Sequence, residues 1–420
     1  MCYKLFMRRL VPLLVCLIFC AARPARTQVQ STAVYAGAGP QKAIWILGND
    51  GRLSAFDSSS FRLRMTTGVP PDTPKDPEKL SISPLGMVIF AGTGPETHLL
   101  HLWSSNRYAP ELTGGVEEKL PSEGGGGTKV TFATPVVYFT ADGQRLFWFE
   151  NRMTETQRGE NVSRTGRFLS WTTNLQGGDL RKVLSFDLAR CACETGACEE
   201  SCPQMSAWAP ASGVSDFFFL TRWIPGQTES ETLETNLYQR TNGGWAPKKL
   251  PVPVDSFLDA ADRGETYVDA VPDAGCCGWI NESDDVTFVS HGGQIAKLFN
   301  ERSRFHNDDY DVSFFTSNAR LSPDVTQIAY TVESTRTAGQ EIRLSSEGKS
   351  NPDELRAIQA ALPDLPRVEV VPIADLSKPR FSLADSELVG WMDTKRLLAF
   401  QRGELIIVDA ATGQSSPTGL

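Results

Sequence analysis

The chain has 420 residues, of which 40% are hydrophobic and 22% are charged, so it can bury a core of the ordinary globular kind. Its net charge of −9 argues against a nucleic-acid-binding protein, because such proteins present a basic face. The length fits two or three ordinary domains or one large all-β domain, so the pattern of predicted elements has to decide between them.

The N-terminus has the pattern of a secretory signal peptide. Lys4, Arg8 and Arg9 precede an apolar run over residues 10–19, and two alanines follow Cys20. This run is shorter than a membrane span, so we expect a cleaved leader over residues 1–25 rather than a retained anchor. The protein is then exported, to the periplasm or to the outside of the cell. Cys20 leaves a lipoprotein open as an alternative, although Phe19 stands where a lipobox has a small residue.

From residue 31 onward, short apolar runs alternate with turn residues. KAIWIL and RLSAF flank Asn49-Asp50-Gly51, and an Asp-Gly pair between apolar runs is a strong hairpin signal. The block from residue 136 to residue 189 supplies four further short strands, and later runs such as SDFFFLTRW, ETYVDAV and GELIIVDAATG continue the pattern. The sequence therefore predicts an all-β protein.

One unit recurs along the chain. ARLSPDVTQIAYTVE, residues 319–333, has two strand-like runs around a Ser-Pro-Asp turn, and looser copies begin at Ser81, Tyr138 and Gly390. Seven such units can be counted, at an average spacing of roughly 56 residues, which is compatible with long propeller blades. We therefore predict a single β-propeller domain over residues 31–420, with seven blades; the uneven spacing is also compatible with six or eight. Strands at both ends of this domain favour ring closure by pairing of the N- and C-terminal strands within one blade.

One segment is predicted to be helical. Asn351 is an N-cap candidate, Pro352 suits the first helical position, and Leu355, Ile358 and Leu362 recur at helical spacing before a proline. We expect a short helical insertion between strands near residues 351–362.

The Ser-Pro-Asp turn followed by an apolar strand resembles the TolB-like β-propellers, which are related to WD-repeat proteins. The terminal VDAATG is similar to the strand end of quinoprotein-like propeller repeats. The repeat copies directly cover about a third of the chain, and Val325 departs from the pattern by standing where Gly is usual after Asp324. The resemblance implies a fold only, since propellers host many functions.

The cysteines form two clusters. Three of the nine cysteines lie in the leader, which leaves six in the mature chain: Cys191, Cys193, Cys198, Cys202, Cys276 and Cys277. An even number in an oxidising compartment favours disulfides, with 15 connectivities open. Paired C-x-x-C ligand knuckles are absent, so a zinc or cluster site and a redox-active pair are the lesser alternatives.

No motif specifies a reaction or a cofactor. The loop at residues 306–311 spaces Asn307, Asp309 and Asp311 as a calcium site could, but Val312 stands where an EF-hand loop has glycine. A second acidic loop holds Glu282, Asp284 and Asp285. Solvated loops explain both more simply. His98 and His101 lie three apart on a predicted strand and so on opposite faces, which excludes a simple metal pair. We predict no catalytic, cofactor-binding or metal-ligating residue; calcium and zinc remain alternatives.

The favoured function is a non-catalytic interaction scaffold for a protein, peptide or glycan partner in the envelope or outside the cell. The alternative is a propeller-type hydrolase, lactonase-like or glycan-processing, in which carboxylates and a calcium ion in the central channel act as acid and base. Convergence of Asp, Glu and His on the channel would favour that alternative. A third interpretation, a metal- or redox-linked envelope protein, depends on the six cysteines alone.

Overall fold

The computed structural model describes residues 35–39, 43–48, 51–68, 80–82, 88–91, 99–104, 107–108, 112–113, 128–132, 136–158, 161–175, 178–194, 204–210, 213–224, 232–254, 256–272, 285–298, 310–311, 314–334, 343–344 and 366–420. The described strands form seven antiparallel sheets of four or five strands and one two-stranded sheet. Within each of the larger sheets the strands follow one another along the chain. We number these seven sheets in chain order.

The first sheet consists of β1 (Tyr35–Gly39), β2 (Ala43–Leu47), β3 (Arg52–Asp57) and β4 (Leu63–Gly68). The second consists of β5 (Leu80–Ile82), β6 (Val88–Ala91), β7 (Leu99–Ser104), β8 (Arg107–Tyr108) and β9 (Leu112–Thr113). The third consists of β10 (Thr128–Phe132), β11 (Val136–Phe139), β12 (Arg145–Arg158), β13 (Asn161–Asn174) and β14 (Arg181–Glu194).

The fourth sheet consists of β15 (Gln204–Trp208), β16 (Phe217–Ile224), β17 (Thr232–Thr241) and β18 (Gly244–Lys249). The fifth consists of β19 (Ser256–Ala261), β20 (Thr266–Pro272), β21 (Asp285–His291) and β22 (Gln294–Lys297), with the 3-10 turn η3 (Asp262–Gly264) after β19. The sixth consists of β24 (Phe314–Leu321), β25 (Gln327–Ser334), β27 (Arg367–Pro372) and β28 (Phe381–Ala384). The seventh consists of β29 (Ser386–Trp391), β30 (Arg396–Gln401), β31 (Glu404–Asp409) and β32 (Ser415–Pro417), and β23 (Tyr310–Asp311) pairs with β26 (Arg343–Leu344).

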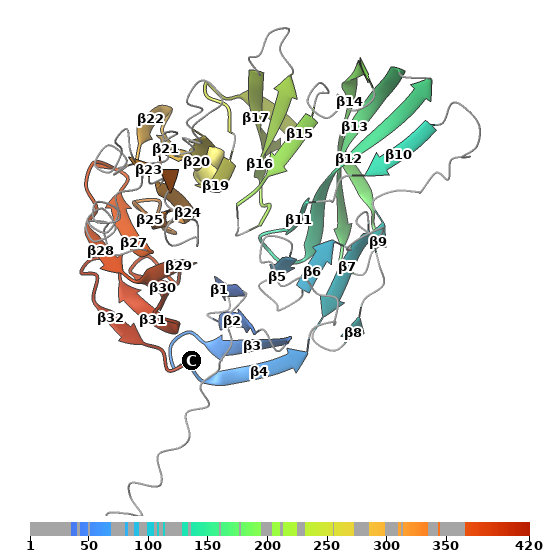
Figure 1. The fold of residues 1–420 in the computed structure, drawn as a ribbon. Coiled ribbons are helices and arrows are strands. Elements are labelled where there is room, and N and C mark those ends of the chain that lie inside the picture. Colours follow the sequence, from blue (N-terminus) through green and yellow to red (C-terminus); the bar gives the residue numbers. More distant parts are fainter. Residues whose placement is uncertain are drawn as a thin grey trace, which may run out of the picture.

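The sheets stand around a ring, with the blue first sheet beside the red seventh sheet (Figure 1). Consecutive four-stranded antiparallel sheets arranged radially are the architecture of a β-propeller. The prediction of an all-β propeller is confirmed. Seven blade-sized sheets lie in the part of the chain that the structure describes.

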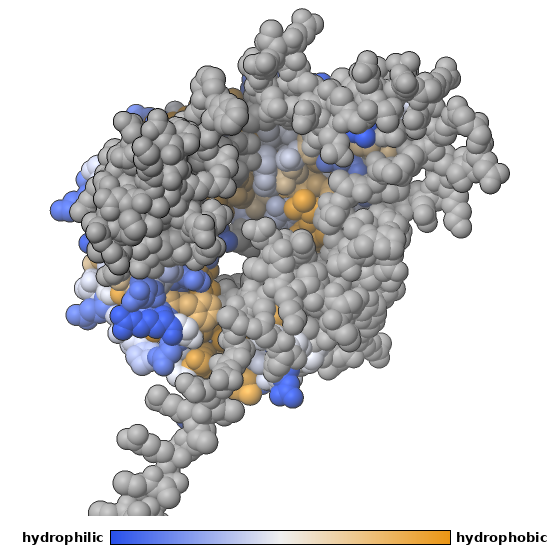
Figure 2. Space-filling model, viewed as in Figure 1, coloured by the Kyte–Doolittle hydropathy of each residue, from blue (hydrophilic) through white to orange (hydrophobic). Residues whose placement is uncertain are grey.

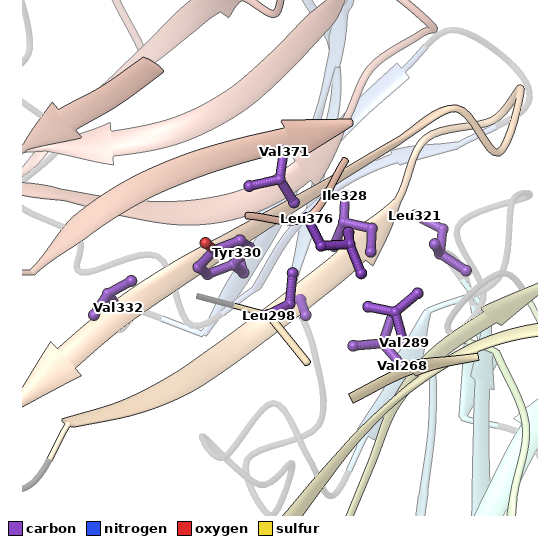
Figure 3. Packing of buried hydrophobic residues seen from close by; sticks show 10 residues of the cluster. Val268, Val289, Leu298, Leu321, Ile328, Tyr330, Val332, Val371 and Leu376 are labelled. Carbon is purple, nitrogen blue, oxygen red and sulfur yellow. The ribbon is translucent and has the colours of Figure 1, made fainter. Parts of the chain in front are cut away.

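Hydrophobic clusters join the third to seventh sheets, each to the next, because both faces of a blade are covered. Val268 and Val289 of the fifth sheet pack with Ile328, Tyr330 and Val371 of the sixth (Figure 3). Comparable clusters connect the third sheet with the fourth, the fourth with the fifth and the sixth with the seventh. β27 shows this burial on both faces. Five consecutive residues, 367–371, are buried, whereas a strand with one covered face would bury every second residue.

The prediction of closure through a shared blade is wrong. β1 pairs only with β2 among the described strands, and β29 to β32 complete the seventh sheet without an N-terminal strand. The two sheets meet instead through side chains, where Ile44 of β2 packs with Leu398, Leu405 and Ile407. Among the described strands, burial of apolar side chains therefore closes the ring at this seam without backbone pairing.

The recurring unit occupies one place in the topology. Its four copies lie at the connection into the strand that is second in the hydrogen-bonded order of its sheet: β24–β25, β5–β6, β11–β12 and β29–β30. In the sixth sheet the Asp324 carboxylate accepts hydrogen bonds from the Ser322 hydroxyl, at 2.7 Å, and from Thr326. In the third sheet Asp142 accepts one from Thr140 at 2.5 Å. These bonds, the side-chain ones first, hold the pKa of both carboxyl groups below their ordinary value.

Three predictions fall outside the described residues. They are the signal peptide, the helix near residues 351–362 and most of the loop at residues 306–311, of which only Tyr310 and Asp311 are described, in β23. None of the described elements is a helix with the length and hydropathy needed to cross a membrane.

Candidate functional site

The first strands of the fifth, sixth and seventh sheets, β19, β24 and β29, lie next to one another along the inner side of the ring. Each of them has a register shift against its neighbour within the sheet, at residues 257–259, 317–320 and 388–390. A β-bulge bends a strand and redirects its side chains. These strands form the inner wall on which the hydrolase alternative would place its carboxylates.

Asp259 of β19 is the buried carboxyl group of this wall. It is 8% exposed, and the backbone N–H of Leu321 in β24 donates to its Oδ2 at 2.9 Å. Burial raises the pKa of Asp259, while the charge of Arg320 and the backbone N–H groups of Leu321 and Ala260 oppose that rise. The group is thus used to join two neighbouring blades.

The β24–β29 contact is built in the same way. The indole Nε1 of Trp391 donates to the carbonyl of Arg320 at 2.8 Å, and the Asn318 amide donates to the carbonyl of Leu388. Arg320 itself donates to the carbonyl of Leu258 at 3.0 Å. Asn318 takes a φ of +52°, which asparagine tolerates better than most residues. These polar side chains of the inner wall therefore form contacts between blades.

Two other carboxyl groups lie near enough to interact electrostatically, Glu333 near the end of β25 and Glu387 in β29. The Ser317 hydroxyl donates to Glu333. Burial and then the charge of Glu333 raise the pKa of Glu387. Within the described residues, no three His, Cys, Asp or Glu side chains are grouped closely enough to hold a metal ion.

A buried charged pair lies deeper, between the fifth and sixth sheets. Arg367 and Glu369 are 6% and 3% exposed, and Arg367 Nε donates to Glu369 Oε1 at 2.7 Å. The hydroxyl of Tyr330 donates to the other oxygen of Glu369 at 2.6 Å. Both carboxylate oxygens are hydrogen-bonded, which is how a protein accommodates a buried charge. We assign this triad to packing of the sixth blade.

The third sheet contains a feature with no counterpart in the other described sheets. Its strands β12, β13 and β14 are each 14 residues long, and they extend outward from the ring at the upper right of Figure 1. β11 pairs with residues 146–149 of β12, whereas β10 pairs with residues 152–156. The outer halves of the strands, together with β10, form a projecting sheet that we call the arm: residues 128–132, 151–158, 161–168 and 187–194.

The base of the arm is fixed to the fourth sheet. The side-chain amide of Asn151 donates to the carbonyl of Met205 in β15 at 2.8 Å. Met153 and Leu188 lie on either side of Gly166, where a Cβ would come within 2.4 Å of the Met153 sulfur and 2.8 Å of Leu188 Cδ1. The arm therefore leaves the ring in a defined direction.

The opposite face of the arm is polar and accessible. Thr165 and Arg167 of β13 are exposed, and Arg167 Nε donates to Asp187 Oδ1 of β14 at 2.8 Å. Thr154 lies directly across from Thr165, and Thr156 across from Ser163. Figure 2 shows the different character of the ring, where hydrophobic residues lie around the central opening and hydrophilic ones toward the rim.

The cysteine prediction stays a prediction. Cys191 and Cys193 lie in β14 at the arm, opposite Arg164 and Val162 of β13. The other four cysteines, Cys198, Cys202, Cys276 and Cys277, lie outside the described residues.

Of the acidic-loop and histidine candidates, few fall in the described ranges. Asp285 begins β21 and Asp311 ends β23, while His101 lies within β7. The remaining candidates, Glu282, Asp284, Asn307, Asp309 and His98, lie outside. The interblade groups Asp259, Asn318 and Trp391 were not singled out from the sequence, because no local motif distinguishes them.

Comparisons with known proteins identify no family for this chain. No protein-family model matches the chain, and no curated protein does. Among solved structures, the chain is similar to the crystal structure of BamB from Moraxella catarrhalis, with 12% sequence identity over 89% of this chain and 83% of that chain and a TM-score of 0.38.

Proposed function

We propose that this propeller is an exported, non-catalytic interaction scaffold, and that it binds a protein partner through the arm. The observation that carries the proposal is the arm itself. Strands of about 5–6 residues suffice for a blade, so β12, β13 and β14 extend well beyond the length that a blade needs.

The chemistry of the arm suits a protein surface. Its exposed face combines hydroxyl groups with the charges of Arg167 and Asp187, and both side chains are more than half exposed, at 56% and 79%. A mixed polar face of this kind matches the rim of protein–protein interfaces. Asp259, Asn318 and Trp391 of the inner wall are by contrast already engaged between blades. A peptide or a glycan is the other class of partner, and it would be recognised by the same hydroxyl groups.

Export and disulfides belong to the same proposal. The leader at residues 1–25 would deliver the chain to the periplasm or the outside of the cell, where the six mature-chain cysteines would be oxidised. Cys191 and Cys193 would then fasten β14 to a neighbouring segment at the arm. No resident calcium or zinc is part of this proposal.

The test is quantitative co-purification from the native host. The tagged full chain is compared with a variant in which Asn-Gly replaces residues 152–167, which joins Asn151 to Phe168, its partner across the β12–β13 ladder. We expect specific partner proteins to be depleted at least tenfold in the shortened variant, provided that its melting transition stays cooperative. Arg167→Glu, a single exposed substitution, should weaken capture in the same direction without affecting the fold. Equal recovery from all three chains would refute the arm as the binding surface.

A second candidate function rests on the Glu333–Glu387 pair. Burial and then the charge of Glu333 raise the pKa of Glu387, and a carboxyl group with a raised pKa beside a second carboxyl group is an arrangement that acid–base catalysis uses. Hydrolysis of a γ-lactone or of p-nitrophenyl glycosides that Glu387→Gln abolishes would establish this function. The scaffold proposal predicts no such Glu387-dependent turnover.

A further inference from the structure

The outermost strand of each blade has one free side among the described residues, and several of these edges are protected. β18 contains Pro247 and the exposed Lys248 and Lys249, β22 ends with Lys297, and β32 ends with Pro417. Short edges, lysine and proline are the usual means by which proteins prevent edge-to-edge pairing of sheets.

β14 differs from these edges. It is 14 residues long, it pairs only with β13 among the described strands, and residues 183–188 contain no Lys, Arg or Pro. The register shifts against β13 fall at Val183 and at residues 189–190, so residues 184–188 form a regular segment between two bulges. An unprotected regular segment of this kind is a template for another strand.

The pairing with β13 defines which side chains share a face. Three residues of β14 lie opposite alternate residues of β13: Lys182 opposite Trp171, Ser185 opposite Leu169 and Asp187 opposite Arg167. Because alternate residues of a strand share a face, these three side chains of β14 lie on one face. Leu184 and Phe186 lie opposite Ser170 and Phe168, on the other face. The bulge at Val183 is what brings Lys182 onto the face of Ser185.

We propose that β14 pairs antiparallel with β14 of a second copy of this chain, about a twofold axis at Ser185. In this register Leu184 lies opposite Phe186 of the second copy, on the half-buried face, and the twofold axis generates this contact twice. Lys182 meets Asp187 twice, on the exposed face, with Val183 again accommodated as the bulge. Arg167 binds Asp187 through Oδ1, so the ammonium group of the second copy approaches Oδ2. The contact is self-complementary, as a twofold interface requires.

Other registers lose this complementarity. A pairing centred on Leu184 sets Ser185 opposite Lys182 of the second copy. A pairing centred on Phe186 sets Ser185 opposite Asp187. Neither register forms the two Lys182–Asp187 ion pairs. A pairing centred on Asp187 opposes two carboxylates. Charge therefore selects the register at Ser185, in the way that polar residues specify strand and helix pairings.

A cysteine at the axis tests the register. Residues directly opposite in antiparallel strands have Cα atoms about 4.5–5.5 Å apart, within the range of a disulfide. Ser185→Cys should give a covalent dimer on mild oxidation that reduction reverses. Ser415→Cys, also exposed at the outer strand of a blade, is the matched control and should remain monomeric. Equal cross-linking of both variants, or of neither, would overturn the proposal.

Charge reversal tests the same contact without a new cysteine. Sedimentation of the wild-type protein should show a concentration-dependent dimer. Lys182→Glu should weaken it at least about tenfold, and the double variant Lys182→Glu/Asp187→Lys should restore it. Lys249→Glu on β18 is the control and should leave dimerisation unchanged. A wild-type protein that is monomeric at about 100 µM, or a dimer indifferent to these charges, would exclude the pairing. Neither outcome depends on whether the arm binds another protein.

Discussion

The carboxylate of Asp259 in β19 accepts a hydrogen bond from the backbone N–H of Leu321 in β24, at 2.9 Å, and thereby joins the inner strands of two neighbouring blades. Its side chain is 8% exposed, so the ionised form is poorly solvated. The charge of Arg320 compensates only in part, because the pKa of Asp259 remains raised.

This relationship predicts a pH-dependent effect of Asp259→Asn. An acid whose folded-state pKa is raised stabilises the fold below its unfolded pKa of about 3.9, and that contribution is lost as the pH rises through the folded pKa. The asparagine carbonyl can still accept the Leu321 N–H without ionising. We therefore expect the free energy of unfolding of the variant, relative to wild type, to increase from pH 3.5 to pH 7, measured by urea denaturation. A difference that stays constant or decreases with pH would contradict the raised pKa.

Replacement of Val325 is expected to stabilise the protein. This β-branched residue takes a φ of +56°, in the turn position where the third sheet has Gly143 at +67°. Both backbone amides close the same turn, on Ser322 and Thr140, at 2.8 Å and 2.7 Å. Val325→Gly should stabilise the protein by about 1 kcal/mol, since relief of the positive φ exceeds the entropy lost by glycine. The reciprocal Gly143→Val should destabilise it, and loss of stability in both variants would show that the turns are not equivalent.

Replacement of Gly213 is expected to cause a large loss of stability. It takes a φ of +98°, and an added Cβ would lie 2.4 Å from the carbonyl oxygen of Phe139. The next residue, Val214, exchanges backbone hydrogen bonds with Phe139 and Ala141, at 3.0 and 3.1 Å, which link the third and fourth sheets. Gly213→Ala should cost about 2–4 kcal/mol in thermal or urea unfolding. Gly292→Ala, with a φ of +57° but nothing within 4 Å of the new Cβ, is the control and should cost about 1 kcal/mol.

At the seam between the first and seventh sheets we expect energetic coupling between residues that are distant in the sequence. Ile44 is fully buried and Leu398 is 1% exposed, in one hydrophobic cluster. Each substitution by alanine should cost about 2–5 kcal/mol. In a double-mutant cycle the two costs should differ from additivity by at least about 0.5 kcal/mol, as expected for residues in one cluster. Strict additivity would show that the two sheets do not share a packed interface.

The sequence predicted the repeating elements well, and it did so where a local signal exists. The Ser-Pro-Asp turn at Asp324 and the Asp-Gly turn at Gly143 mark the hairpins because the turn chemistry lies in a few adjacent residues. Short continuous apolar runs such as ELIIVD in β31 then supply the strands. The mode of closure was not predictable in this way. Whether β1 pairs with β32 or with β2 depends on packing between Ile44 and Leu398, which are more than three hundred residues apart.

The arm was missed for a related reason. Residues 150–158 and 161–167 read ENRMTETQR and NVSRTGR, in which polar residues occupy both faces, so no hydrophobic alternation marks a strand. Backbone pairing with neighbouring strands extends β12 and β13 through these residues. The interblade roles of Asp259 and Trp391 were likewise invisible, because their bonding partners lie on the next blade.

Site-specific photo-cross-linking in the native host tests directly whether the arm is the surface on which this propeller binds a protein. A photoreactive amino acid is placed at the exposed Thr165 on the arm and, as a control, at the exposed Thr241 in the hairpin of the fourth sheet. If the arm is the binding surface, we expect a discrete adduct of defined mass from residue 165 and none from residue 241, with the cross-linked protein identified by mass spectrometry. Adducts from residue 241 alone, or no adduct from residue 165, would contradict it.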